Sequence, residues 1–110
     1  MSEPARPRHR TVLAALRALE ADFLARAECF FGGGTRIVLA LGEYRESGDV
    51  DFLCANREGY RALRSTVSEA SLGSIAKPSL KLAREVVADR YGIRTFLDVR
   101  GEKLKLEIIL

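Results

Sequence analysis

Histidine and cysteine are scarce in this chain of 110 residues, and their scarcity excludes several classes of protein. The sequence holds one histidine, His9, and two cysteines, Cys29 and Cys54. Two cysteines are too few for a disulfide scaffold, and with a single histidine they are too few for a zinc site. We therefore interpret both cysteines as small core side chains. The lone histidine lies in an N-terminal segment that we expect to be disordered, which argues against Ser/His/Asp catalysis.

Long hydrophobic runs are also missing. No stretch could span a bilayer, and the N-terminus lacks the apolar segment of a secretory signal. With 47% hydrophobic and 30% charged residues, the composition is typical of a soluble globular protein of one domain. The net charge of +3 permits a polyanionic partner without requiring one. We expect a cytoplasmic protein that does not bind a membrane.

The first ten residues combine prolines with like charges. Three arginines alternate here with two prolines and the histidine. Such a segment offers little that could pack against a core. We therefore expect residues 1–10 to be a disordered basic lead-in and residues 11–110 to form the domain. Thr11 is placed to cap a helix over residues 11–27, where apolar residues recur at helical spacing.

Downstream, short apolar strands alternate with amphipathic helices. We expect strands at 29–31 and 49–54, helices over 35–44 and 58–70, and a loop over 71–78. The segment 80–90 has the composition of a helix, but we favour a strand at 84–88. Further strands are expected at 93–99 and 103–109, joined by tight turns. This order predicts an α+β (mixed α/β) fold, a mixed β-sheet with helices packed on it.

Three consecutive glycines at residues 32–34 end the first predicted strand and open a helix. The N–H groups in the first turn of a helix have no partner within it and carry the positive end of its dipole, so they bind anions. Gly33 and Gly34 have no side chain that would keep a phosphate from the backbone, and Thr35 adds a hydroxyl. We predict phosphate binding at these three residues, with an ordinary strand–helix turn as the alternative.

Two aspartates follow at the start of the next predicted strand. Asp49 and Asp51 are two residues apart, so their carboxylates project from the same face of that strand. Ionised carboxylates held so close repel each other, and a divalent cation is the usual way to stabilise such a pair. Together with the glycines they predict Mg²⁺ or Mn²⁺ bound with a nucleoside triphosphate. Two solvated side chains on an exposed face are the alternative.

Other phosphate and metal motifs are excluded by single positions. A P-loop needs a lysine directly after its last glycine, and Thr35 and Arg36 follow here. The dinucleotide motif G-x-G-x-x-G fails because Ile37 stands three residues after Gly34. An EF-hand needs an oxygen ligand where this sequence has Leu53.

The string GGGT followed by DVDF resembles the first motif of the nucleotidyltransferase superfamily, that of DNA polymerase β and tRNA-modifying transferases. The pattern Arg45-x-Ser47-x-Asp49-x-Asp51 is more specifically similar to the AbiEii/AbiGii toxin nucleotidyltransferase family of bacterial abortive-infection and toxin–antitoxin systems. The resemblance covers residues 29–110. It implies that Arg45 and Ser47 contribute to nucleotide binding; membership of a polar loop without a function is the alternative for both.

The resemblance also implies a third carboxylate on a later strand. Glu107 matches that position and lies on the polar side of its strand. Asp98 is the second candidate, and for Glu107 the alternative is a surface ion pair with Lys103 or Lys105. The metal ligands and catalytic residues implied by the family are therefore Asp49, Asp51 and Glu107.

The activity implied by the family is metal-dependent transfer of a nucleoside monophosphate from a nucleoside triphosphate to an acceptor. The acceptor would be RNA such as tRNA, or a protein hydroxyl, and a cognate antitoxin would be a partner. Family members continue into a helical region with a lysine and a further acidic motif, whereas this sequence ends at Leu110. The alternative is therefore a catalytically incomplete module that binds nucleotide or docks an antitoxin.

Overall fold

The longest strands form where apolar and polar residues alternate most regularly. Strand β5 (Gly92–Val99) and strand β6 (Glu102–Ile109) make an antiparallel hairpin. Arg100 and Gly101 turn the chain between them with φ of 55° and 79°, the left-handed values that a tight two-residue hairpin turn requires. Every second side chain of β6, beginning with Leu104, is buried.

The computed structural model describes residues 3–110. The remaining helices and strands are α1 (Pro7–Arg17), α2 (Ala21–Arg26), β1 (Cys29–Gly32), α3 (Gly33–Ala40), β2 (Val50–Cys54), α4 (Arg57–Arg64), the 3₁₀ turn η1 (Gly73–Ile75), β3 (Lys81–Leu82) and β4 (Val87–Ala88). The predicted α+β fold is confirmed.

The sheet is mixed and is ordered β1-β2-β6-β5-β3, with β4 also pairing with β5. Strands β2 and β6 run parallel, and the other pairs are antiparallel. Pairing β2 with the last strand of the sequence brings residues 50–53 next to residues 106–109. The central strand pair therefore joins two segments that are far apart in the chain.

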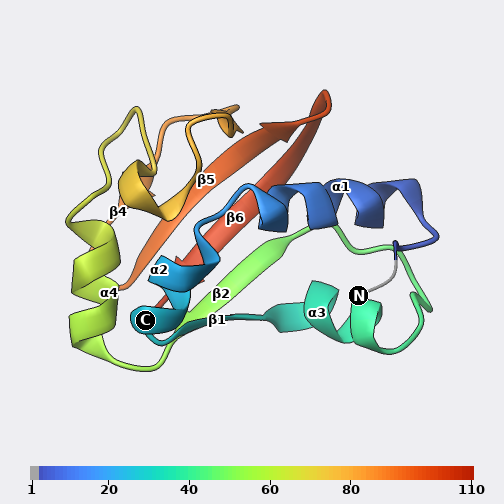
Figure 1. Ribbon diagram of the computed structural model, residues 1–110, viewed down its shortest axis with the longest axis horizontal. Coiled ribbons are helices and arrows are strands. Elements are labelled where there is room, and N and C mark those ends of the chain that lie inside the picture. Colours follow the sequence, from blue (N-terminus) through green and yellow to red (C-terminus); the bar gives the residue numbers. More distant parts are fainter. Residues whose placement is uncertain (1–2) are drawn as a thin grey trace.

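Helices α1, α2 and α4 pack on one face of this sheet, and α1 and α2 lie in front of the strands in Figure 1. The core between these layers contains mainly aliphatic side chains, among them Val12, Leu24, Leu63, Val50 and Leu106. The opposite face of the sheet, which we call the open face, carries the strand side chains that alternate with those in the core. None of the helices formed by residues 3–110 has the length and apolarity needed to cross a membrane.

The N-terminal segment is ordered further than predicted. Helix α1 begins at Pro7, so residues 7–10 of the expected disordered lead-in are helical, and His9 is fully buried. Proline at the first helical position is favourable because its ring fixes φ and its missing N–H has no helical partner there. Residues 1 and 2 of the same expected segment lie outside the described residues.

The single helix predicted over residues 11–27 is wrong, because the chain forms two helices there. Between α1 and α2, the N–H of Glu20 donates to the carbonyl of Ile75 at 2.8 Å, and Leu19 bridges to Ala76. These contacts with Ile75, at the end of η1, and with the next residue take the place of hydrogen bonds within a helix. The break turns α2 toward β1, which it contacts.

Other predicted boundaries also differ. Helix α3 spans Gly33–Ala40 rather than 35–44, and α4 ends at Arg64 rather than at residue 70. Just after α4, the Thr66 hydroxyl donates to the carbonyl of Leu63, a local bond that competes with the helix. The predicted strand at 84–88 is reduced to β4, and β3 precedes it.

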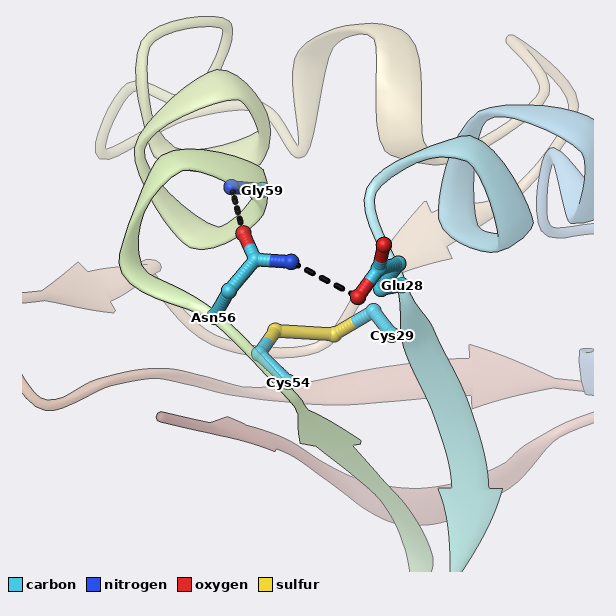
Figure 2. Close-up of a disulfide and its surroundings, with 5 residues drawn as sticks. All are labelled: Glu28, Cys29, Cys54, Asn56 and Gly59. Atoms are coloured by element: carbon cyan, nitrogen blue, oxygen red, sulfur yellow. Dashed lines mark hydrogen bonds between the residues drawn. A yellow bond between two sulfur atoms is a disulfide. The ribbon is translucent and has the colours of Figure 1, made fainter.

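Cys29 lies in the core and Cys54 packs against it, as predicted, but the two side chains are also joined to each other, which the sequence did not indicate. Cys29 and Cys54 stand directly opposite each other in the β1–β2 ladder and form a disulfide (Figure 2). Beyond it, the Asn56 side chain caps α4 through the N–H of Gly59 at 2.7 Å and donates to Glu28 at 2.8 Å. The disulfide and these bonds fix one end of the β1–β2 pair, and the glycine turn lies at the other end.

Candidate active site

The glycine turn packs directly against an aspartate. Strand β1 ends at Gly32, which pairs with Asp51, and α3 begins at the next residue. Gly33 has φ of 74°, and a Cβ atom there would lie 2.6 Å from Oδ2 of Asp51. Within residues 3–110, no side chain forms a capping hydrogen bond at the N-terminus of α3. The turn therefore needs glycine for its conformation and for close approach, and it leaves first-turn N–H groups of α3 uncapped.

Two carboxylates lie side by side on the open face. The β2–β6 register pairs Asp51 with Glu107, and neighbours in a parallel register share a face. Asp49 immediately precedes β2 and is exposed. Burial, followed by the charges of Asp49 and Glu107, raises the pKa of Asp51. The site thus concentrates negative charge that a cation would stabilise.

Two basic side chains already bind Glu107. Lys105 Nζ lies 2.6 Å from Oε1, and Arg94 Nε lies 3.2 Å from Oε2. The hydrogen bond from Lys105, joined by that from Arg94, lowers the pKa of Glu107, and the same bond raises the pKa of Lys105. Asp98, the second candidate, pairs with Lys103 on β6 and with Lys81 on β3, away from β2. The register therefore places Glu107, rather than Asp98, beside Asp51.

The loop between α3 and β2, residues 41–49, closes over the start of α3. The hydroxyls of Thr35 and Ser47 are 2.6 Å apart, and the Thr35 side chain is buried. A Cβ atom on Gly34 would lie 3.1 Å from Nη2 of Arg45, so this guanidinium lies over the glycine turn. The structure thus brings the predicted nucleotide-binding residues together, with Thr35 and Ser47 bonded to each other.

The carboxylates of the site differ in how available they are to a divalent cation. Among residues 3–110, no group of three or more His, Cys, Asp or Glu side chains is arranged to hold a metal ion. The carboxylate oxygens of Asp49 and Asp51 still suit Mg²⁺, which binds through one or two carboxylates together with substrate phosphates. The two aspartates supply carboxylate oxygens of the kind that a cation binds, whereas Glu107 is engaged by Lys105 and Arg94.

Sequence reasoning missed two residues of this region, and it named Lys105 only as an alternative ion-pair partner of Glu107, a pair that the structure shows. Lys105 shares the alternation of Glu107 on β6, a signal that could have placed it at the site. Arg94 reaches Glu107 only through the β5–β6 register, and His9 binds residues 43 and 47 from a distant helix. No local pattern in the sequence identifies either of these two.

We expect Gly33→Ala to destabilise the protein more than Gly42→Ala. Both glycines have positive φ, 74° and 82°, but a Cβ atom on Gly42 would meet nothing within 4 Å. Gly42→Ala should cost about 1 kcal/mol for its backbone conformation, and Gly33→Ala about 1 kcal/mol more because it displaces Asp51. Urea denaturation measures both. Equal losses of stability in the two variants would contradict the close contact between Gly33 and Asp51. So would an extra loss in Gly33→Ala that does not shrink when Asp51 is also replaced by alanine.

One of three comparisons with known proteins identifies a family for this chain. Residues 14–110 match a family model described as nucleotidyl transferase AbiEii toxin, type IV TA system. Searches of curated proteins and of solved structures find no significant match. The family match extends from α1 to the end of β6 and includes the glycine turn, both aspartates and Glu107. The chain therefore belongs to the AbiEii nucleotidyl transferase toxin family of type IV toxin–antitoxin systems.

Proposed function

We propose that this protein transfers a nucleoside monophosphate from a nucleoside triphosphate, in a metal-dependent reaction at Asp51 and the glycine turn. The observation that carries the proposal is the contact between Gly33 and Asp51, which leaves no room for a side chain between them. An anion site on backbone N–H groups and a carboxylate site for a cation therefore adjoin. A nucleoside triphosphate with its Mg²⁺ needs both an anion site for its phosphates and a carboxylate site for the cation.

Each residue has a distinct role in this proposal. The backbone at Gly33 and Gly34 and the Arg45 guanidinium hold the β- and γ-phosphates, which leave as pyrophosphate. Asp49 and Asp51 hold the cation. When bound, it supplies charge stabilisation for in-line displacement at the α-phosphorus and lowers the pKa of the attacking hydroxyl.

Glu107, with Thr35 and Ser47, completes the site. Glu107 could join the metal ligands only by leaving Lys105 and Arg94, its partners in the present arrangement. The bonded hydroxyls of Thr35 and Ser47 hold the loop beside the first turn of α3 and lie next to the phosphate position. We assign both residues to nucleotide binding through this placement.

The acceptor in this proposal is RNA, such as tRNA, or a protein hydroxyl. The net charge of +3 is compatible with a polyanionic acceptor. A toxin of a type IV system implies a cognate antitoxin, and we propose such a protein as a partner. We also propose a cytoplasmic location, where nucleoside triphosphates and tRNA are both present.

Calorimetric titration of ATP, GTP, CTP and UTP with and without MgCl₂ tests the nucleotide and metal parts of the proposal. We expect at least one nucleotide to bind only with the metal. Asp51→Asn should weaken that binding roughly 10-fold or more, since it removes a charged ligand. Asp98→Asn is the matched control, because this carboxylate lies on β5 away from the site. Equal affinities with and without metal would refute a role for the aspartates as ligands.

A second candidate function is nucleotide binding without transfer, in a module that docks an antitoxin. The engagement of Glu107 by Lys105 and Arg94 favours it, because a third metal ligand is then not free. Metal-dependent nucleotide binding without incorporation of label into RNA or protein would support this candidate.

A further inference from the structure

His9 is a fully buried histidine that joins α1 to the loop of the candidate site. Its side chain has no exposed surface. Ring atom Nδ1 lies 2.8 Å from Oε1 of Glu43, and Nε2 accepts a hydrogen bond of 2.9 Å from the backbone N–H of Ser47. Both partners belong to the loop of residues 41–49. One ring on the N-terminal helix therefore binds this loop at two points.

These contacts fix the tautomer of His9. A backbone N–H can only donate, so Nε2 must be the unprotonated ring nitrogen, and the proton resides on Nδ1 and is donated to Glu43. The backbone N–H groups of Arg6 and Ala5 lower the pKa of Glu43 to about 2. Glu43 is therefore a carboxylate near neutral pH, and a ring protonated on both nitrogens would direct an N–H at the N–H of Ser47.

The loop is held from a second side by Arg8. Its guanidinium lies directly against Gly48, where it leaves no room for a Cβ atom. Arg8 also binds Glu102 at 3.2 Å and donates to the carbonyl of Lys103 at 2.9 Å, at the start of β6. The first turns of α1 thus connect the loop to the sheet.

The residue that His9 binds also reaches the glycine turn. Ser47, whose N–H donates to His9, has its hydroxyl 2.6 Å from that of Thr35 in the first turn of α3. Asp49 is only two residues further along the chain. A shift of Ser47 would therefore move the loop relative to α3 and to the aspartate pair.

We propose that His9 is a positioning residue, whose neutral imidazole sets the loop that carries Arg45, Ser47 and Asp49 over the glycine turn. The positioning itself follows from the hydrogen bonds of His9, whereas its effect on nucleotide binding rests on the proposed function. His9 touches neither the phosphate position nor the aspartates, so it acts through Ser47 and Glu43.

Two substitutions separate its two hydrogen bonds. In His9→Asn the amide nitrogen can take the place of Nδ1, so the bond to Glu43 is kept and that to Ser47 is lost. In His9→Gln the longer side chain can place its oxygen near Nε2, so the acceptor for Ser47 is kept. If His9 contributed to stability alone, Ser47 exchange and nucleotide binding would change with the unfolding free energy of each variant, whichever hydrogen bond that variant retains.

Nuclear magnetic resonance tests the positioning without reference to activity. We expect the long-range ¹H–¹⁵N spectrum of the His9 ring to show the Nδ1–H tautomer. Amide hydrogen exchange at Ser47 should be roughly 10-fold or more faster in His9→Asn than in the wild type, and close to the wild-type rate in His9→Gln. An Nε2–H tautomer, or unchanged exchange at Ser47 in folded His9→Asn, would overturn the proposal.

Binding of ATP or GTP with MgCl₂ to the same variants tests the consequence for the site. We expect His9→Asn to weaken binding roughly 10-fold, as loss of a supporting contact does, and His9→Gln to restore most of it. Equal loss in both variants would overturn the role of the Ser47 bond. If the wild type binds none of ATP, GTP, CTP and UTP, the proposed function fails, and the Ser47 exchange rates still decide the positioning.

Discussion

Replacing Asp49 and Asp51 together by alanine is expected to abolish nucleotidyl transfer while the fold is retained. Asp49 is exposed and Asp51 lies on the open face, so neither carboxylate supports the core. In the proposed mechanism, removing both leaves the cation without protein ligands, and several kcal/mol of transition-state stabilisation would be lost. Such a loss corresponds to a decrease in rate of roughly 10³-fold or more. Incorporation of radiolabelled nucleotide into total tRNA or into protein measures it.

The matched control for this experiment is Asp98→Ala. Asp98 is a carboxylate of the same sheet that pairs with lysine positions on β6 and β3, so its removal should leave the transfer rate unchanged. Circular dichroism verifies that each variant is folded. Persistent transfer in the double variant would refute the metal mechanism, together with the assignment of the glycine turn and the aspartates to one site. Absence of transfer in the wild type, with nucleotide still bound, would support the non-catalytic candidate.

Reduction of the Cys29–Cys54 disulfide is expected to lower the free energy of unfolding by about 3 kcal/mol. The bond closes a loop with a sequence separation of 25 residues. Its main contribution, in the chain-entropy account, is to restrict the unfolded chain, and a loop of this size corresponds to about 3 kcal/mol. Urea denaturation with and without a reductant measures the difference.

The Cys29→Ala/Cys54→Ala variant is the control for this measurement. Its stability should not respond to the reductant, so the response of the wild type isolates the cross-link from the packing of the buried Cys29 side chain. A wild type whose stability and free-thiol content do not change on reduction would show that the bond does not form. In a reducing compartment the thiol form would prevail, so the reduced sample also measures the stability that the protein would have under such conditions.

Alternation along the chain was sufficient to predict the strands that build the site. The pattern of β6 places Glu107 with the polar side chains, and the glycines mark the passage from β1 to α3. Both signals are local, because strand periodicity and the conformational freedom of glycine act over a few residues. The ends of the helices could not be predicted equally well. Two backbone hydrogen bonds, from Glu20 to Ile75 and from Lys77 to Ala18, each join residues more than fifty positions apart and decide where α1 and α2 separate.

The sequence by itself determined the α+β class, the glycine turn and the candidate carboxylates, because each depends on neighbouring residues. Only the tertiary structure decided which of them meet. The parallel pairing of β2 with β6 sets Asp51 beside Glu107, and the β1–β2 register sets Cys29 opposite Cys54. The burial of His9 between α1 and the site loop depends on the packing of the whole chain. Register and packing are set by contacts between distant segments, and no short stretch of sequence contains that information.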